Sequence, residues 1–317
     1  MPDLSAEDRK AISFLSGTQA PRQSVCRQVY PAGNVHRFRL DRAASLFIFY
    51  PLRTWMRSAT RGIPILMYHQ VARGLGSRRV HPYYRTDTDP LVFEEQMSFL
   101  KRNGYRTVHL GEAIRLMQEP PADSEKRVVI TFDDGFQDFY SDAFPILQKH
   151  GFSATVFLPT GFIGRQSRMF KSAPCLTWSE VRELSRAGII FGSHTVTHPQ
   201  LSQLPLAEVE KELRRSKDTI EQQLGRLVDS FAYPYAFPEA DTAFRRQLRR
   251  ILLEAGYQYG VSTTIGTATQ ASDPLLMRRL PVNSCDDPQL FRAKLEGGYD
   301  WLHTFQYASK LIGRVRG

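Results

Sequence analysis

An apolar run that ends abruptly in two carboxylates constrains the fold of this chain more than any other feature. Residues 128–132 are Val-Val-Ile-Thr-Phe, and Asp133, Asp134 and Gly135 follow at once. A strand that is apolar on both faces is typical of a buried parallel sheet. Active sites of α/β sheets and barrels lie at the carboxyl ends of such strands. By itself an Asp-Asp-Gly sequence is more often a plain turn, so a second motif is needed to distinguish an active site from a turn.

From residue 62 onward, segments that predict strands alternate with segments that predict helices. The expected strands cover residues 63–68, 128–132, 154–158, 189–192, 231–234, 259–262 and 280–282. The expected helices cover residues 93–100, 111–118, a segment that ends at 150, 178–187, 206–227, 242–255 and 288–295. The alternation repeats about seven times, which favours a parallel, barrel-like α/β fold.

The chain divides into three parts by pattern. We predict a partly ordered N-terminal extension over residues 1–61, a barrel over 62–300 and a C-terminal tail over 301–317. The uncharged stretch 43–52 is only about half as long as a membrane span. Because Arg42 and Arg53 flank it, this stretch could lie at a membrane interface. We favour instead that it packs against the barrel.

The charge balance bears on the partners of the chain. Its 317 residues include 42 Lys and Arg against 32 Asp and Glu, a formal net charge of +10. This excess fits an anionic partner such as a membrane or a phosphorylated lipid carrier, and equally a basic surface that serves solubility. Nucleic acid is excluded, because the basic residues are scattered and no nucleic-acid motif accompanies them. Residues 1–8 lack the apolar core of a signal peptide, so we expect a cytoplasmic protein or one peripheral to the inner face of the membrane.

A second motif, some sixty residues after the first, points to metal chemistry. His194 and His198 follow the strand predicted over 189–192 and are four residues apart. On a helical turn both imidazoles can reach one ion, and their place after a strand puts them on the rim that holds Asp134. Two histidines and one carboxylate form a familiar ligand set for a catalytic divalent metal. An isolated pair of this kind is more often structural, but the joint occurrence of both motifs indicates a metal hydrolase.

Together these motifs resemble those of the polysaccharide deacetylases, the NodB-like enzymes of carbohydrate esterase family 4. The similarity covers about residues 62–295 and extends to residues 64–69 and 176–178. It implies a distorted (β/α)7 barrel of the polysaccharide deacetylase type with an N-terminal extension. It also implies metal-dependent removal of N-acetyl groups from an amino sugar in a polysaccharide or a lipid-linked glycan.

The resemblance also implies a role for each motif residue. Asp134, His194 and His198 would bind the metal, which would be zinc, with cobalt or nickel as alternatives. Asp133 would be the general base that takes a proton from water activated by the metal. The tetrahedral oxyanion needs a second donor, and the backbone amide of Tyr235 corresponds to it.

The sequence departs from the family pattern in two places. Ala232 stands where the family carries the arginine that holds the base, so the partner of the base is unassigned. The histidine that serves the family as general acid is also missing, because His303 lies beyond the last predicted helix. We therefore propose His69, at the end of the first strand, for the acid or for a substrate contact. Arg278 could reach the site, but we favour a surface position for it.

Two other functions remain compatible with the sequence. The same barrel and metal could act on a non-sugar amide, imide or formamide. Alternatively, the chain could be a glycan-binding module that has lost catalysis, which the two altered motifs would explain. The intact carboxylate and histidine pairs argue against such a module. Aromatic residues in the expected rim loops could stack on sugar rings and favour a sugar substrate; these are Tyr83, Tyr84, Phe162 and Phe170.

Overall fold

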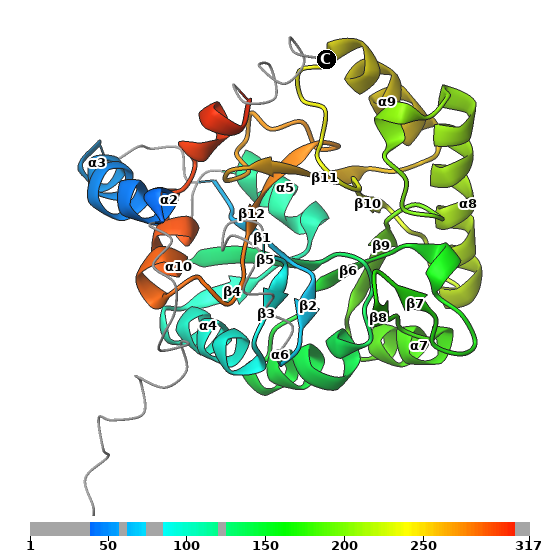
Figure 1. Cartoon of the computed structure of the whole chain (residues 1–317), viewed down its shortest axis with the longest axis horizontal. Helices are drawn as coiled ribbons and strands as arrows, with labels where there is room; N and C mark the ends of the chain where they lie inside the picture. The colour runs from blue at the N-terminus through cyan, green and yellow to red at the C-terminus, as the bar shows by residue number, and fades with distance from the viewer. Residues whose placement is uncertain (1–38, 57–61, 74–84, 120–124, 308–317) are drawn as a thin grey trace, which may run out of the picture. The chain divides into compact units, whose positions relative to one another are not determined.

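The computed structural model of the chain describes residues 39–56, 62–73, 85–119 and 125–307 (Figure 1). Tyr83 and Tyr84, two of the predicted rim aromatics, lie outside the described residues. Within the described ranges, seven parallel strands form a closed barrel in the order β1-β12-β11-β10-β9-β6-β5, and β5 pairs with β1 to close it. These strands are β1 (Ile65–Tyr68), β5 (Lys126–Phe132), β6 (Thr155–Leu158), β9 (Ile190–Ser193), β10 (Ser230–Ala232), β11 (Tyr259–Ile265) and β12 (Met277–Pro281). The predicted (β/α)7 barrel is confirmed.

Helices follow most of the strands and cover the outside of the barrel (Figure 1). Their bounds agree with the predictions to within a few residues, except that α8 stops at Leu224. Gly225 has a φ of 64° there and ends the helix, so Leu227, expected on the apolar face, is 90% exposed. The helices are α4 (Pro90–Arg102), α5 (Leu110–Gln118), α6 (Phe144–His150), α7 (Trp178–Arg186), α8 (Leu206–Leu224), α9 (Thr242–Glu254) and α10 (Pro288–Leu295).

Several short elements decorate the barrel. β4 (Tyr105–Thr107) pairs with the first three residues of β5. It was not predicted, because three residues give little periodic signal. β2 (Gln70–Val71) pairs with β3 (Asp87–Thr88), and β7 (Met169–Phe170) forms an antiparallel hairpin with β8 (Ala173–Pro174). A π-helical turn, Phe139–Ala143, leads into α6, and two 3₁₀ turns cover Thr160–Phe162 and Leu201–Gln203.

The side chains that fill the barrel come from alternate positions of its strands. A buried inner cluster contains Ile65, Val129 and Met277, and Leu110 and Ala113 of α5 pack against it. Because side chains alternate between the two faces of a strand, positions two residues further on face the same interior. This parity directs Thr131 and Arg279, and then Asp133, to the inside of the barrel near its carboxyl rim.

The register of the strands brings the predicted site residues to one rim. β1 and β5 pair Tyr68 with Phe132, so His69 and Asp133 leave neighbouring strands at the same level. β6 and β9 pair Leu158 with Ser193, which sets His194 at that level as well.

A helical segment before β1 packs on the flank of the barrel. It consists of α2 (Leu40–Ala44), a π-helical turn (Ser45–Phe49) and α3 (Tyr50–Met56). Figure 1 shows it beside α10 and the last described helical turn. Phe49 stacks on Trp301 with ring centroids 4.6 Å apart. We had predicted packing for the stretch 43–52, although not a helix.

No helix among the described residues is both long enough and apolar enough to cross a membrane.

Candidate active site

The structure brings all six predicted site residues to the carboxyl rim of the barrel. His69 follows β1, Asp133 and Asp134 follow β5, His194 and His198 follow β9, and Tyr235 follows β10. His69 Nε2 lies 4.0 Å from Asp133 Oδ2. The rings of His198 and Tyr235 have centroids 4.7 Å apart.

Arg279 is the partner of Asp133 that the sequence analysis left unassigned. Its Nη1 and Nη2 each donate to one oxygen of Asp133 at 2.7 Å, a two-point contact that fixes the plane of the carboxylate. Nη1 also donates to Thr131 Oγ1 at 3.1 Å, and Nε donates to the Ser262 carbonyl at 3.0 Å. The Arg279 side chain is fully buried. Together these contacts hold the Arg279 guanidinium in one orientation against the Asp133 carboxylate.

The neighbours of Asp133 keep its carboxylate ionised. Burial alone would raise its pKa, but the charges of Arg279 and the nearby histidines outweigh burial and lower the pKa to about 2. Asp133 is thus an oriented proton acceptor at neutral pH.

Asp134, His194 and His198 form a buried group whose donor atoms converge. Asp134 Oδ1 lies 3.6 Å from His194 Nε2 and 3.2 Å from His198 Nε2. Within the described part of the chain, these three are the group of side chains arranged to hold a metal ion, with one ligand atom each and all atoms within 4.8 Å of one another. Their chemistry, two imidazole nitrogens and a carboxylate oxygen, suits zinc and its neighbours.

The tautomer of His194 tests whether a cation fits this group. His194 Nδ1 lies 2.7 Å from the Ala232 carbonyl, which can only accept, so Nδ1 carries the proton. Burial lowers the pKa of His194 to about 4, so the ring is neutral and its Nε2 presents a lone pair. That lone pair faces a carboxylate oxygen at 3.6 Å. Two acceptors that face each other in a buried site repel unless a cation lies between them, so the residues fit a metal.

The two histidines lie in a loop, and the predicted helical turn was wrong. Thr195 and His198 have φ values of 68° and 56°, in the left-handed region that a helix does not use. Glu212 of α8 holds this loop, because one of its oxygens accepts from the backbone amides of Val196 and Thr197 at 2.8 and 2.9 Å. The imidazoles converge because backbone turns and a carboxylate clamp aim them, rather than because of helical periodicity.

Lys171 is a further charged residue at the site that the sequence analysis did not single out. It lies at the tip of the β7–β8 hairpin, where Lys171 and Ser172 have φ values of 48° and 68°. Its Nζ lies 3.0 Å from Asp134 Oδ2 and sits over the rings of Phe170 and Tyr235, at 4.8 and 5.5 Å from their centroids. Left-handed backbone at two consecutive non-glycine residues is costly, and here it directs an ammonium group to a candidate metal ligand.

Aromatic side chains wall the site on the side of the hairpin. Phe170 approaches His198 edge-on with ring centroids 5.2 Å apart, and Phe162 packs on Phe170 at 4.3 Å. Tyr235 is half exposed, so its ring faces both the site and solvent. Of the four predicted rim aromatics, the two that the structure describes, Phe162 and Phe170, therefore both belong to this wall.

The backbone amide of Tyr235 is available as a hydrogen-bond donor. Tyr235 has a φ of 58°, and its carbonyl accepts from Thr263 Oγ1 at 2.9 Å. Its N–H donates to none of the described residues. An amide that the fold leaves without an acceptor beside His198 can serve a ligand in the site.

Arg278 and His303, which entered the sequence analysis, and the buried Cys175 stand apart from the chemistry. Arg278 alternates with Arg279 on β12 and is only partly buried, so it faces away from the site, as predicted. His303 Nε2 lies 2.8 Å from Glu239 Oε1 and takes no part in the group. Burial raises the pKa of the Cys175 thiol to about 12, so this thiol is not a nucleophile at neutral pH although it lies next to Asp134.

Comparison with known proteins agrees with this geometry. A family model described as polysaccharide deacetylase matches residues 121–260. YxkH of Bacillus subtilis, a relative named for the same family, is 31% identical over 234 residues, which cover 74% of this chain and 76% of the relative. A poly-β-1,6-N-acetyl-D-glucosamine N-deacetylase of Staphylococcus aureus is 25% identical over 200 residues, which cover 60% of this chain and 66% of that enzyme.

Solved structures give the same result for the fold. The Streptococcus pyogenes deacetylase PplD in complex with acetate has a TM-score of 0.63 and 29% identity, and the match covers 74% of this chain and 99% of that one. IcaB from Ammonifex degensii has a TM-score of 0.59 and 25% identity, with 74% and 97% of the two chains covered.

Proposed function

Since this chain belongs to the polysaccharide deacetylase family, we propose that it is a metal-dependent hydrolase that removes N-acetyl groups from an amino sugar in a polysaccharide or a lipid-linked glycan. One observation carries the proposal. The His194 lone pair and a carboxylate oxygen of Asp134 face each other at 3.6 Å in a buried site, beside an oriented carboxylate, Asp133.

Asp134, His194 and His198 would hold the metal, with zinc as the first choice and cobalt or nickel as alternatives. A divalent cation bound there would act as a Lewis acid that polarises the acetyl carbonyl and lowers the pKa of water. The hydrogen bond from His194 Nδ1 to the Ala232 carbonyl would keep the ring in the tautomer that presents Nε2.

Asp133 would act as the general base. Its two oxygens already accept from Arg279, and each carboxylate oxygen can accept one hydrogen bond more. As water adds to the acetyl carbon, Asp133 would take the proton. Arg279 would be a positioning residue, because it touches the base and no reacting atom. It replaces, from another strand, the arginine that the sequence lacks at Ala232, and this removes one reason to regard the chain as a lapsed binding module.

The Tyr235 amide would donate to the oxyanion that forms when water adds. The carbon–nitrogen bond then breaks, and the amine of the sugar must gain a proton. His69 lies at the rim, 4.0 Å from Asp133, and we propose that it passes to this nitrogen the proton that Asp133 took from water. Acetate and the free amino sugar are the products.

The aromatic wall supports a sugar substrate. Phe162, Phe170 and Tyr235 offer ring faces and edges around the donor set, and pyranose rings stack on such surfaces. The Staphylococcus aureus relative is named for a poly-N-acetylglucosamine substrate, which supports a glycan of the same kind here. No observation favours a non-sugar amide.

The test is acetate release from free, polymeric and lipid-linked N-acetylated amino sugars. The metal-loaded protein is compared with Asp133→Asn, His198→Ala and the matched control His303→Ala. We expect Asp133→Asn to lose roughly 10²–10⁴-fold in turnover. His198→Ala should lose turnover and stoichiometric metal together, and His303→Ala should retain both.

Full activity of His198→Ala would overturn the metal site, and full activity of Asp133→Asn would overturn the base. Metal bound in a ratio of one, with no acetate released from any sugar, would favour an amide of another class. No metal and no acetate would favour a glycan-binding module.

A further inference from the structure

The helical segment on the flank of the barrel exposes large apolar side chains along one stripe. Trp55 is 82% exposed, Phe47 76% and Ile48 58%. Leu40 and Leu52 are exposed as well. Residues 47, 48, 51, 52 and 55 have the spacing of one α-helical face. We call this stripe of Leu40, Phe47, Ile48, Pro51, Leu52 and Trp55 the apolar face.

The apolar face continues onto the end of the chain. Phe49 stacks on Trp301, and Trp301 contacts Phe305 with ring centroids 5.1 Å apart. Phe305 is itself 62% exposed. An apolar surface that spans two segments is larger than the single exposed side chains that any monomer carries.

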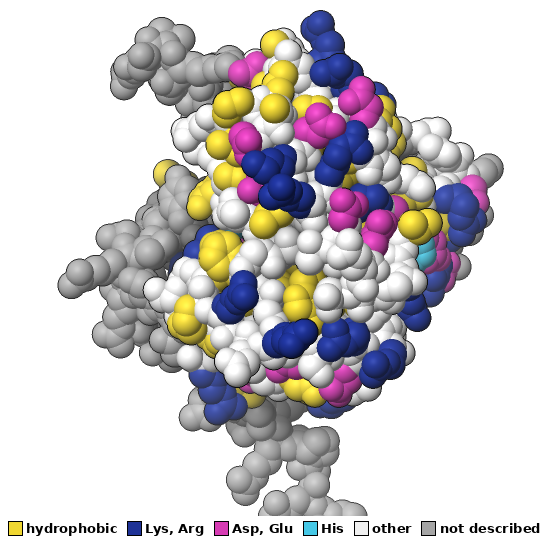
Figure 2. Space-filling view, turned by 90° about the vertical axis from the view of Figure 1, so that its right-hand side faces the viewer, with side chains coloured by type: hydrophobic (Ala, Val, Ile, Leu, Met, Phe, Trp, Pro, Cys, Tyr) yellow, Lys and Arg dark blue, Asp and Glu magenta, His cyan; other side chains and the backbone are white. Residues whose placement is uncertain are grey.

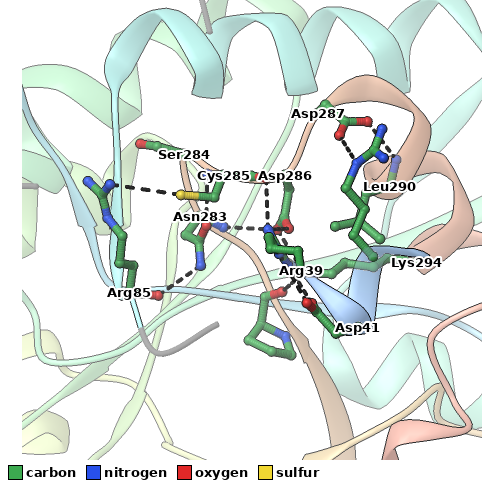
Figure 3. A network of polar contacts seen from close by, with 12 residues as sticks. Arg39, Asp41, Arg85, Asn283, Ser284, Cys285, Asp286, Asp287, Leu290 and Lys294 are labelled. Carbon is green, nitrogen blue, oxygen red and sulfur yellow. Dashed lines mark hydrogen bonds and ion pairs between the residues drawn. The ribbon is translucent and has the colours of Figure 1, made fainter. Parts of the chain in front are cut away.

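Ion pairs anchor the opposite side of the helical segment, so its apolar face is presented by a fixed element. Arg39 pairs with Asp41 and donates to the Cys285 carbonyl at 2.9 Å, as Figure 3 shows. Asp41 accepts from the Tyr299 hydroxyl at 2.8 Å, and Arg42 pairs with Asp287. The Trp301 indole donates to Ser45 Oγ at 2.9 Å. The polar groups on this side are thus paired with groups of the barrel, and the apolar face lies on the side exposed to solvent.

The rest of the surface looks different. Figure 2 shows the right-hand side of the view in Figure 1, where α8 lies, and on it single hydrophobic side chains are scattered among basic and acidic ones. Leu227 and Leu253, outside the apolar face, are also exposed.

The charge balance of this part of the sequence is basic, although Arg39, Arg42 and Arg53 are each paired with an acid among the described residues. Between residues 39 and 61 the sequence has five arginines, at positions 39, 42, 53, 57 and 61, against one acid, Asp41. Asp41 is buried in its ion pair. The whole chain carries a formal charge of +10. A surface helix with Trp, Phe, Ile and Leu on one face and arginines at its ends has the composition of helices that lie in the interface of anionic membranes.

We propose that the apolar face docks the protein on an anionic phospholipid surface, with the helical segment parallel to the membrane plane. The side chains of Phe47, Ile48 and Trp55 enter the boundary between headgroups and acyl chains, and the positive net charge of the chain attracts it to anionic lipid. This site is separate from the catalytic rim, because no residue of the apolar face touches the metal group or Asp133. Docking therefore works whether or not the chain is a deacetylase.

Flotation of the full-length chain with vesicles tests the proposal. One vesicle set contains phosphatidylcholine alone, and the other also contains phosphatidylglycerol. We compare the wild type, the double variant Phe47→Ser/Trp55→Ser and the matched control Leu227→Ser/Leu253→Ser. The wild type and the control should float with the anionic vesicles, and the double variant should lose about a hundred-fold or more in affinity, since two large apolar side chains no longer insert. Added salt should weaken the binding.

A second measurement does not depend on a variant with lower affinity. Brominated acyl chains should quench the tryptophan fluorescence of the wild type, and Trp55→Phe should remove most of that quenching while flotation persists. Acetate release from a water-soluble substrate should be equal in all forms, because the apolar face lies outside the site.

Three results would overturn the proposal. The wild type could fail to float, or it could float equally well with neutral vesicles. Alternatively, the double variant could float as the wild type does but have a lower molecular mass in solution. That result would make the apolar face an interface between two copies of this chain. None of these outcomes depends on catalytic activity, so a failed deacetylase assay leaves the test intact.

Discussion

The molecule contains two clusters of buried charge that differ in how completely they are paired. On the flank, Arg39 and Lys294 face Asp41 and Asp286, two cations against two anions. Lys294 Nζ lies 2.7 Å from Asp286 Oδ2 and donates to the Pro281 carbonyl at 2.6 Å (Figure 3). At the rim, Asp133 and Asp134 are two anions, and Arg279 is a buried cation that pairs with Asp133.

The difference lies in what each cluster lacks. The flank cluster is neutral and its groups point at one another, so it joins α2, α10 and the residues after β12. The rim cluster carries one negative charge in excess inside the barrel, where burial makes an uncompensated charge costly. Lys171 offsets part of it from a half-exposed position on the hairpin. His198 Nδ1 is buried and makes no hydrogen bond with the described residues. A buried group of charges thus does not by itself indicate a functional site. A buried group with more hydrogen-bond acceptors than donors and cations to pair with them does.

The sharpest test of this comparison removes one buried cation from each cluster. Arg279→Met and Lys294→Met each remove the cation that lies nearest to a buried carboxylate, so each should destabilise the fold by about 3–5 kcal/mol. Only Arg279→Met should also lower turnover per folded molecule, by more than about a hundred-fold, because Asp133 loses its orientation. Denaturant unfolding and acetate release at matched folded fractions give the two quantities. An equal loss of turnover in Lys294→Met would erase the distinction between the clusters.

Asp138 provides an intermediate case, a buried carboxyl whose hydrogen-bonding neighbour is neutral. Gln70 Nε2 lies 3.4 Å from it, and burial raises its pKa to about 6. In the unfolded chain the pKa is about 3.9. Folding therefore favours the protonated form, and the stability that this form provides is lost as the pH rises through 6, at a cost on the order of 3 kcal/mol.

Asp138→Asn should remove that cost. Its free energy of unfolding should match that of the wild type near pH 4 and exceed it by about 2–3 kcal/mol at pH 8. Thermal unfolding across this pH range measures the difference. A constant difference at every pH would mean that the Asp138 carboxyl does not titrate as the buried site predicts.

The smallest effect concerns Lys171. Its ammonium group lies 3.0 Å from Asp134 Oδ2. It therefore competes with a metal cation for this carboxylate. Lys171→Met should tighten metal binding by about ten-fold, a modest factor because the side chain is half exposed and screened. Lys171→Arg keeps the charge and should resemble the wild type. Competition with a chelator measures the dissociation constants, and weaker binding in Lys171→Met would show that Lys171 supports the metal rather than opposes it.

The sequence was sufficient to predict the barrel and to name six residues that lie on one rim of it, because strands that are apolar on both faces and residues that follow them are local signals. Arg279 was missed for a physical reason. We placed the start of its strand at residue 280, since Arg278 and Arg279 interrupt the apolar pattern, whereas β12 begins at Met277. A charged residue inside a barrel is explained only by its partner, and Asp133 lies 146 positions away.

Two other errors have similar causes. The spacing of His194 and His198 suggested a helical turn, but left-handed residues and the clamp by Glu212, on a later helix, bend this loop instead. The helix over residues 40–56 was not predicted, because Pro51 lies inside it and a π-helical turn interrupts its α-helical hydrogen bonding. Its stability comes from contacts with residues near 290–300, which no local pattern reveals.

Those contacts also set the order in which the molecule can be completed. Asp41 meets Tyr299, 258 residues later in the chain, so the helical segment has no anchor until nearly all of the protein has left the ribosome. At usual rates of synthesis this interval lasts on the order of tens of seconds. Throughout it, Phe47 and Trp55 belong to a nascent segment that chaperones can bind. Of the helices that the structure describes, the first to be made is thus among the last to be placed.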